Sequence, residues 1–337
     1  MNILEDVDLR KYNTFHVSAH ARYFADITSL EQLRATLAWV KERQLPYMLI
    51  GQGSNILFKQ DYPGLVMELN IKGIRLVDET PEYADVEALC GEVWHDFVQH
   101  TLGQGWYGLE NLSLIPGTVG AAPVQNIGAY GAEVKDTLLT LDALHIESGE
   151  MRAFTNADCG FGYRDSVFKR ELRDQYIICR VRFRLGKQAE LNLDYPALRD
   201  ALRDVPADQL TPRLVSATVC RIRSSKLPDH HQIGNAGSFF WNPKVSREDF
   251  DRLRQAFPAI VGYPDDGMVK VPAAWLIEKA GWKGYREGDV GVHRDHALVL
   301  VNHGKATGAQ LVQLSEKIRA SVQQMFGIVL YPEVRIV

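Results

Sequence analysis

The sequence predicts an α+β protein made of several compact units, and three observations support this prediction. Apolar residues recur at helical spacing in residues 30–40 and 307–325, behind capping residues. Residues 71–215 are instead rich in short alternating segments, which are typical of strands. A chain of 337 residues is also too long for one typical domain. We expect three units, at residues 1–70, 71–218 and 219–325. A C-terminal strand at residues 326–337 is expected to return to the second unit.

The charge balance limits the classes of partner. Lys and Arg together number 38 against 42 Asp and Glu, a formal net charge of -4. A general binder of nucleic acid or of anionic membranes needs a basic excess, so we expect neither partner. The acidic start lacks a secretory signal, and the longest apolar runs, such as 297–301, are strand-sized. We therefore expect a soluble cytoplasmic protein, and a monomer.

Cysteine and histidine usage predicts no metal site. The four cysteines are scattered without a Cys-x-x-Cys pair, which favours free buried thiols in a reducing compartment. His16 and His20 are four residues apart and His293 and His296 three apart, but no carboxylate-rich helix frames either pair. Residues 230–231 form a histidine doublet in a predicted loop. Structural or surface roles are the expected ones for all of them.

The first unit begins with a helix followed by two strands. Ser29 opens a capping box with Gln32, and apolar residues then recur at helical spacing. Pro46 ends this helix. Residues 47–50 form a short buried strand, and residues 56–58 form a second strand after a glycine loop.

The second unit is rich in strands and has one helix at 92–102, which Gly103 and Gly105 end. In residues 179–185, Cys, Val, Phe and Leu alternate with three arginines. This pattern predicts a half-buried strand with one basic face. A stripe for phosphate groups and a solvated face both fit the arginines, and the solvated face is the favoured interpretation.

Two helices are expected in the third section. Ser246 caps the first, whose apolar residues occupy 250–257. Thr307 starts a longer helix that Gly327 ends. The tail, residues 328–337, alternates like a strand.

A first glycine loop, Gly51-Gln52-Gly53-Ser54-Asn55, lies between the two predicted strands of the first unit. It is not a Rossmann fingerprint, because Ile56 replaces the third glycine and a strand follows instead of a helix. Such a turn can present successive backbone N–H groups to a pyrophosphate. Taken alone, a plain hairpin turn explains it equally well.

A second segment, residues 108–131, is dense in small residues and poor in charge. A long irregular loop in a compact domain is uncommon unless it has a function. Small residues allow the backbone to pack closely on a flat, rigid ligand. Two separate glycine loops, one for a diphosphate and one for a ring system, suit a dinucleotide such as FAD held outside a Rossmann fold.

Seven motifs in order along nearly the whole chain resemble those of the UDP-N-acetylenolpyruvoylglucosamine reductase family, MurB. Each motif alone is weak, but seven in the right order are very specific. They are Asn13-Thr14-Phe15, the Gly51 loop, Ile115-Pro116-Gly117-Thr118-Val119-Gly120-Ala121, Asn126-Ile127-Gly128-Ala129-Tyr130-Gly131, Gly160-Phe161-Gly162-Tyr163-Arg164-Asp165-Ser166, Gly234-Asn235-Ala236-Gly237-Ser238-Phe239-Phe240 and Pro332-Glu333-Val334-Arg335.

The resemblance implies an α+β fold of the vanillyl-alcohol-oxidase type. The first two units would then be FAD-binding subdomains that hold FAD non-covalently, and the third would be a substrate-binding domain. The implied reaction is ping-pong: NADPH reduces the flavin and leaves. UDP-N-acetylglucosamine enolpyruvate then enters and is reduced to UDP-N-acetylmuramate, a precursor of peptidoglycan.

The resemblance also implies a set of flavin-binding residues in the two glycine loops and near the C-terminus. Ala121 and Ala122 stand where some relatives have serines, which removes hydroxyl contacts there, and the chain stops at Val337 without the extra segment of some relatives. The implied flavin-binding residues are Gly51, Gln52, Gly53, Ser54, Asn55, Ile115, Pro116, Gly117, Thr118, Gly120, Ala121, Gln125, Asn126, Gly128, Tyr130 and Arg335.

Three residues match the catalytic positions of the family. Arg164 would hold the substrate carboxylate in a bidentate fork; the alternative is a surface arginine paired with Asp165. Glu333 would lie beside the same group, where burial near negative charge promotes its protonated form; the alternative is a solvated strand-end charge. Ser238 would donate the proton, which a dry, preorganised site makes feasible; the alternative is a turn hydroxyl bonded to its own backbone.

Further matching positions would hold the UDP part of the substrate. A cation is needed for the diphosphate, and Lys226 is also a candidate for the NADPH phosphate in the other half-reaction. For the neighbouring Arg221 a solvated charge remains the better interpretation. The substrate-binding candidates are Tyr195, Arg223, Lys226, Asn242 and Tyr263.

Two other functions remain open at this stage. Another FAD-dependent oxidoreductase of the same fold is the first, although such oxidases often carry a flavin-linking histidine near the glycine loop. Here Gln52, Ser54 and Asn55 occupy those positions. A non-catalytic binder of nucleotide sugars is the second, and it would need no flavin loops.

Overall fold

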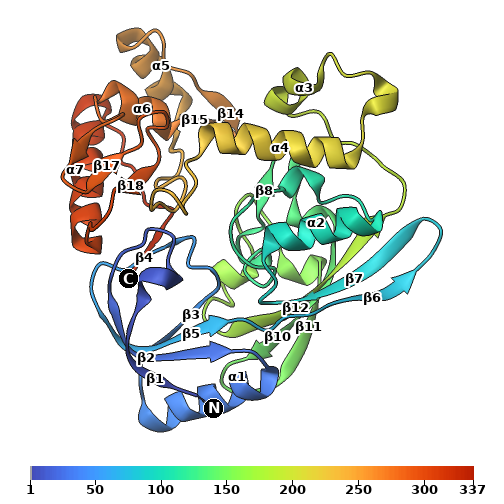
Figure 1. Ribbon diagram of the computed structural model, residues 1–337. Helices are drawn as coiled ribbons and strands as arrows, with labels where there is room; N and C mark the ends of the chain where they lie inside the picture. Colours follow the sequence, from blue (N-terminus) through green and yellow to red (C-terminus); the bar gives the residue numbers. More distant parts are fainter. Residues whose placement is uncertain (1) are drawn as a thin grey trace. The chain divides into compact units, whose positions relative to one another are not determined.

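The computed structural model describes residues 2–337 (Figure 1), and the chain forms two compact units. Each unit consists of three chain segments, so the chain passes from one unit to the other several times. The first unit contains Met1–Glu5, Tyr23–Gln52 and Gly64–Ser225, and the second contains Asp6–Arg22, Gly53–Pro63 and Lys226–Val337. The predicted division into three units stays a prediction.

The first unit contains most of the strands of the chain. One sheet has four strands in the order β1-β2-β5-β3, and the other has five in the order β11-β10-β12-β7-β6. Strands β1, β2 and β5 each continue from one unit into the other. The helices and longer strands are β1 Leu4–Asp8, β2 His20–Ile27, α1 Leu30–Arg43, β3 Tyr47–Ile50, β5 Tyr62–Leu69, β6 Ile74–Glu79, β7 Tyr83–Leu89, α2 Trp94–Gln104, β10 Leu138–His145, β11 Met151–Thr155, β12 Tyr176–Gly186, α3 Pro196–Leu202 and α4 Pro212–Lys226.

Helix α2 packs its apolar side onto the five-stranded sheet (Figure 1). The rings of Phe97 and Phe183 lie 5.1 Å apart, and Trp94 lies 6.0 Å from Phe183. The helix ends at Gly105, which has a left-handed φ of 80°. The prediction that Gly103 also ends the helix is wrong, because Gly103 lies inside it and remains helical.

The predicted helix behind Ser29 is confirmed as α1. The Ser29 hydroxyl accepts a hydrogen bond from Gln32 N at 3.1 Å, as an N-cap does. The Gln32 side chain accepts from Thr28 N at 2.8 Å, one residue earlier than in the predicted capping box. Helix α1 stops at a left-handed Gln44, two residues before Pro46.

The predicted basic strand is confirmed as β12, but its arginines are paired. Strand β12 lies between β7 and β10, and both partners carry carboxylates on the same face. Arg184 donates to both oxygens of Asp85, at 2.8 and 2.9 Å. Arg180 pairs with Asp142, and Arg182 approaches Glu87 at 3.5 Å. The face is therefore an ionic network, neither a phosphate stripe nor a row of purely solvated charges.

The second unit has three small sheets around one apolar core. Helix α7 supplies Leu311, Leu314, Ile318 and Val322 to this core. The helices and short strands of this unit are β4 Ile56–Leu57, β13 Lys244–Val245, α5 Arg247–Ala256, β14 Tyr263–Asp265, β15 Met268–Lys270, α6 Ala273–Lys279, β16 Arg286–Glu287, β17 Val290–Val292, β18 Leu300–Asn302, α7 Gly308–Phe326 and β19 Arg335–Ile336.

Both predicted helices of the third section are confirmed, with their caps. Ser246 caps α5, and Thr307 forms a reciprocal capping box with Gln310 at the start of α7. Gly327 ends α7 with a φ of 70°. The tail is a strand only at β19, which pairs in parallel with β4 instead of joining the five-stranded sheet. Among residues 2–337, no helix is long and apolar enough to cross a membrane.

Candidate active site

The two glycine loops meet within the first unit, although more than sixty positions of sequence separate them. Gly117 N donates a hydrogen bond to Gln52 Oε1 at 2.8 Å. A Cβ added at Gly51 would lie 2.9 Å from Thr118 Oγ1, so a side chain there would force the loops apart. The backbones can therefore approach each other only because Gly51 is glycine.

Backbone hydrogen bonds fix the second loop to the segment between β7 and α2. Val119 N donates to Glu92 O, and Gly120 N donates to Cys90 O, both at 2.9 Å. A Cβ at Gly120 would lie 2.5 Å from Cys90 Cβ. The loop is thus held in one conformation, with Thr118 buried. Its half-buried or exposed residues include Ile115, Pro116, Ala121 and Gln125.

The rest of the first loop belongs to the second unit and lies beside the C-terminal strand. Arg335 N donates to Asn55 O at 3.0 Å, and Asn55 Nδ2 donates to Glu333 O at 3.4 Å. Within residues 2–337, no hydrogen bond uses the backbone N–H groups of Ser54 or Asn55. These donors remain available for an anionic group, as a pyrophosphate loop requires.

Asn126 connects the second glycine loop to the segment that carries Arg164. Its Nδ2 donates to Gly162 O at 3.0 Å, and its Oδ1 accepts from Lys135 N at 3.1 Å. The side chain is buried, and its backbone is left-handed with a φ of 44°. The Asn126 amide therefore acts within the protein, and any contact with a flavin would come from other atoms of this loop.

Arg164 lies at the tip of a tight turn. Gly162 and Asp165 exchange two backbone hydrogen bonds, at 3.0 and 3.2 Å, and Arg164 between them has a φ of 55°. Lys169 Nζ donates to the Arg164 carbonyl at 3.0 Å. A non-glycine residue in this region is strained by about 1–3 kcal/mol and persists only when its surroundings hold it. The turn therefore fixes the backbone position from which the Arg164 side chain extends.

Arg164 does not pair with Asp165, so that alternative is wrong. The Asp165 carboxylate pairs with Arg170 instead. Across residues 2–337, no carboxylate lies within ion-pair distance of Arg164. A Cβ at Gly128 would lie 3.6 Å from Arg164 Nη1, which places the guanidinium against the second glycine loop.

Arg223 on α4 is a second cation without a carboxylate in the part of the chain that the structure describes. Its Nε donates to Leu114 O at 3.1 Å. Burial lowers the pKa of Arg223, and the nearby positive charge of Arg164 lowers it further. Two arginines that share one region without a counterion create a site for an anion.

Two asparagines that sequence reasoning missed join the loops of Tyr130 and Tyr195. Asn111 Nδ2 donates to Tyr130 O at 2.8 Å and to Asn192 O at 2.9 Å, and Asn192 Nδ2 donates to Gly131 O at 3.0 Å. The rings of Tyr130 and Tyr195 meet edge to face, with centroids 5.1 Å apart. The only sequence signal was that Asn111 belongs to the loop rich in small residues.

Within the second unit, Ser238 and Glu333 lie on adjacent segments. Glu333 N donates to Phe239 O at 2.8 Å, and Phe239 N donates to Leu298 O at 2.8 Å. Ser238 is half-buried, and no hydrogen bond among the described residues uses its hydroxyl. The alternative of a turn hydroxyl bonded to its own backbone is therefore not what the structure has.

The remaining substrate-binding candidates lie at several places in the fold. Lys226 is the exposed last residue of α4, and Tyr263 on β14 is 55% exposed. Asn242 Oδ1 accepts from Ala273 N at 2.9 Å and so caps α6. This contact leaves the Asn242 amino group as the part that can donate to a ligand.

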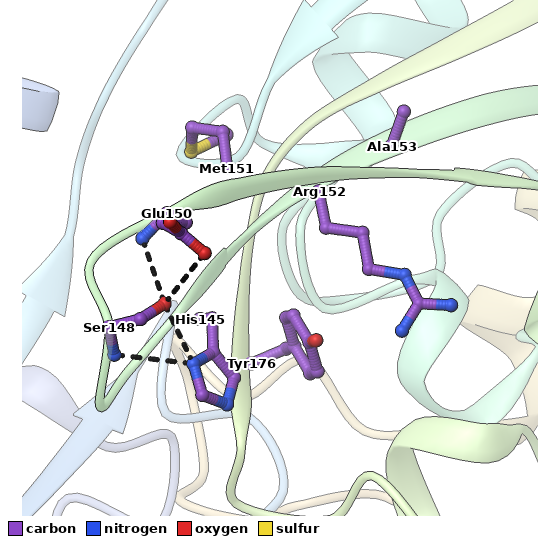
Figure 2. A pocket seen from close by; sticks show the side chains of 7 residues that line it. All are labelled: His145, Ser148, Glu150, Met151, Arg152, Ala153 and Tyr176. Carbon is purple, nitrogen blue, oxygen red and sulfur yellow. Dashed lines mark hydrogen bonds between the residues drawn. The ribbon is translucent and has the colours of Figure 1, made fainter.

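A shallow pocket at the β10–β11 turn contains Ser148, His145 and Glu150 (Figure 2), but it is not a nucleophilic triad. Ser148 Oγ lies 3.0 Å from His145 Nδ1 and donates to Glu150 at 3.4 Å, so the serine lies between the other two. A triad needs the histidine in the middle. His145 Nδ1 also accepts from Ser148 N, as in a turn cap. None of the predicted site residues lines this pocket.

Comparisons with known proteins agree with these features. Residues 21–155 match the family model described as FAD binding domain, and residues 228–337 match the C-terminal domain of UDP-N-acetylenolpyruvoylglucosamine reductase. The reductase from Pseudomonas putida is 50% identical over 98% of this chain and 97% of its own length. The enzyme from Chromobacterium violaceum is 52% identical, with 97% of each chain covered.

A solved structure of a reductase of this family also resembles the chain over its full length. The crystal structure of UDP-N-acetylenolpyruvylglucosamine reductase (MurB) from Thermus caldophilus has a TM-score of 0.68, is 25% identical, and covers 100% of this chain and 99% of its own. The predicted fold class, an α+β chain with a FAD-binding fold of the vanillyl-alcohol-oxidase type, is confirmed. The chain belongs to the UDP-N-acetylenolpyruvoylglucosamine reductase family.

Proposed function

We propose that this protein uses NADPH and FAD to reduce UDP-N-acetylglucosamine enolpyruvate to UDP-N-acetylmuramate, for peptidoglycan synthesis. The observation that carries the proposal is the full-length match to reductases of this name at about half identity. The proposal includes the monomeric state and the cytoplasmic location expected from the sequence.

The residues present fit FAD. The glycine loops touch at Gly51 and Thr118, and the N–H groups of Ser54 and Asn55 have no partner among the described residues. These N–H groups would hold the diphosphate, and the second loop would hold the ring system. When bound, FAD would supply hydride transfer from NADPH to the methylene carbon of the enolpyruvyl group.

Arg164 holds the substrate carboxylate. Hydride addition puts negative charge on the neighbouring carbon, and this charge spreads into the carboxylate. A guanidinium fork stabilises the charge as it develops, and the left-handed turn orients it beforehand. Because no protein carboxylate competes for Arg164 within residues 2–337, its full charge is available to the substrate.

Ser238 donates a proton to the carbon that carries the negative charge. Its hydroxyl has no hydrogen bond within the part of the chain described, so it is available for this transfer. A serine is a weak acid, but a carbanion is a strong base. Glu333, on the adjacent segment, stabilises the charge through its own proton.

A further set of residues holds the UDP part of the substrate. Arg223 uses Nε on Leu114 O and turns its remaining donors to the diphosphate, together with Lys226. Tyr195 is 43% exposed and Tyr263 is 55% exposed, so both rings can stack against the uridine, and Asn242 donates through its amide NH₂ group.

Stopped-flow measurement of the flavin absorbance tests the proposal, because it separates the two half-reactions. Ser238→Ala should leave reduction by NADPH nearly intact, while reoxidation by the enolpyruvyl substrate falls by about two orders of magnitude or more. Ser18→Ala, an exposed serine of the same unit, is the control and should change neither rate. Equal losses in both half-reactions of Ser238→Ala would reject the proton-donor role, and wild-type flavin that the substrate never reoxidises would reject the function.

A further inference from the structure

A compact turn follows the end of α4 in the second unit, and Asp229 organises it. The Asp229 carboxylate accepts a hydrogen bond from His231 N at 2.9 Å. The Asp229 carbonyl accepts from the backbones of Gln232 and Ile233, both at 3.0 Å. The Gln232 side chain reaches the other carboxylate oxygen at 3.5 Å. Asp229 is therefore fixed in position although it is exposed.

The turn brings three metal-ligating side chains together. One ligand atom each from Asp229, His230 and His231 lies within 4.8 Å of the other two. The two imidazole rings have centroids 4.1 Å apart and are tilted by 35°. Two stacked imidazoles repel when both carry a proton, and a carboxylate beside them completes a common ligand set for zinc.

We propose that Asp229, His230 and His231 form a binding site for a borderline divalent cation of the Zn²⁺ class. The proposal does not depend on the reductase activity. Imidazole nitrogen favours Zn²⁺ and its neighbours over Mg²⁺ or Ca²⁺, which prefer oxygen ligands. Three protein ligands leave a coordination position for water, as in open zinc sites.

The site is coupled to the segment of the proton-donor candidate. Asn235 Nδ2 donates to Pro228 O at 3.1 Å, at the start of the turn, and Asn235 Oδ1 accepts from Gly237 N at 2.9 Å. Asn235 N also donates to Thr14 O at 2.9 Å. A cation in the turn would therefore stiffen the chain between Lys226 and Ser238.

Isothermal titration of Zn²⁺ into the full-length flavoprotein, without a histidine tag, tests the proposal. We expect one site in the wild type and no binding of Mg²⁺. Replacing both His230 and His231 by Asn should weaken the affinity by about tenfold or more. Asp229→Asn should weaken it less, because an amide oxygen can still accept from His231 N.

The matched control replaces His293 and His296 by Asn, another histidine pair of the same unit that belongs to no group of three metal-ligating side chains among the described residues. This control should bind Zn²⁺ like the wild type. Because residues 229–231 are exposed or half-buried, the variants should keep their flavin content and circular dichroism spectrum. The proposal is overturned if the wild type binds no Zn²⁺, or if the His230/His231 variant binds it as tightly.

Discussion

Arginines occur in two different settings within the first unit. On the outer face of β12, each arginine lies beside a carboxylate, and Arg184 forms a bidentate pair with Asp85. In the candidate site, Arg164 and Arg223 lie near each other with no carboxylate partner among the described residues. Both settings belong to the first unit, but only the second leaves the positive charge without a carboxylate partner among the described residues.

The difference shows what distinguishes a structural arginine from a binding one. A carboxylate that occupies one side of the guanidinium fork compensates its positive charge, as Asp85 does for Arg184. Arg164 and Arg223 instead contact glycine-rich or carbonyl surfaces, at Gly128 and Leu114. Keeping two cations close together without a counterion costs stability, and such a cost is expected where a ligand later supplies the negative charge.

The largest expected effect is at Arg164. Arg164→Met should slow flavin reoxidation by the enolpyruvyl substrate about 100-fold or more, because a preorganised charge is lost in the transition state. Arg164→Lys should be slowed less than Arg164→Met, because the positive charge is kept. It should still be slower than the wild type, because a point charge cannot reproduce the fork. Stopped-flow reoxidation rates measure both, with Arg184→Lys as the control from the paired face. An unchanged rate in Arg164→Lys would contradict the assigned role.

The next effect concerns stability and its dependence on pH. Burial alone raises the pKa of Glu87, but the hydrogen bond from Arg75 and the charges of Arg180, Arg75 and Arg182 outweigh it, so the pKa is lowered. A lowered folded pKa adds stability above the ordinary Glu value of about 4.3, and this stability is lost as the pH falls through the folded pKa.

Glu87→Gln should therefore reduce the free energy of unfolding at pH 7 by about 2 kcal/mol, with a difference that shrinks toward acid pH. Urea denaturation followed by tryptophan fluorescence measures this. Glu42→Gln removes an exposed pair with Arg43 and should change the stability by less than about 0.5 kcal/mol. A Glu87→Gln protein as stable as the wild type at pH 7 would show that the network contributes nothing.

A smaller effect is expected on α4, where two arginines differ in burial and in their neighbours. Arg223→Met should raise the KM for the sugar nucleotide about tenfold, which corresponds to the loss of about 1.4 kcal/mol of binding. Arg221 is exposed, and Arg221→Met should leave KM unchanged. Steady-state kinetics of the two variants side by side test the contrast, and equal KM values would mean that the uncompensated charge of Arg223 does not serve the substrate.

The smallest effect should come from Asn111, which positions the Tyr195 loop. Asn111→Ala loses two hydrogen bonds, so substrate binding should weaken by about 1 kcal/mol and KM should rise several-fold. The rate of flavin reduction by NADPH should stay the same. If Asn111 acts through Tyr195, the same substitution should have no further effect in a Tyr195→Ala background. Additive effects in this double-mutant cycle would show that Asn111 acts elsewhere.

The sequence by itself determined the local features and the family. Ser29, Ser246 and Thr307 start helices as predicted, since an N-cap depends on residues within one turn. The order of the glycine and aromatic motifs identified the flavoprotein family, because each motif is short and contiguous. Local patterns also misled at Gly103, because either glycine could end the helix and the structure continues it to Gln104, with Gly105 as the left-handed cap.

Only the tertiary structure decided which polar side chains pair with one another. Asp85 and Arg184 are 99 positions apart, and Asn111 and Asn192 are 81 apart. No periodicity or motif links residues at such separations, because strand register and loop contacts bring them together. For the same reason the sequence offered Asp165 as the partner of Arg164, whereas the turn directs Asp165 to Arg170 and leaves the Arg164 charge for a ligand.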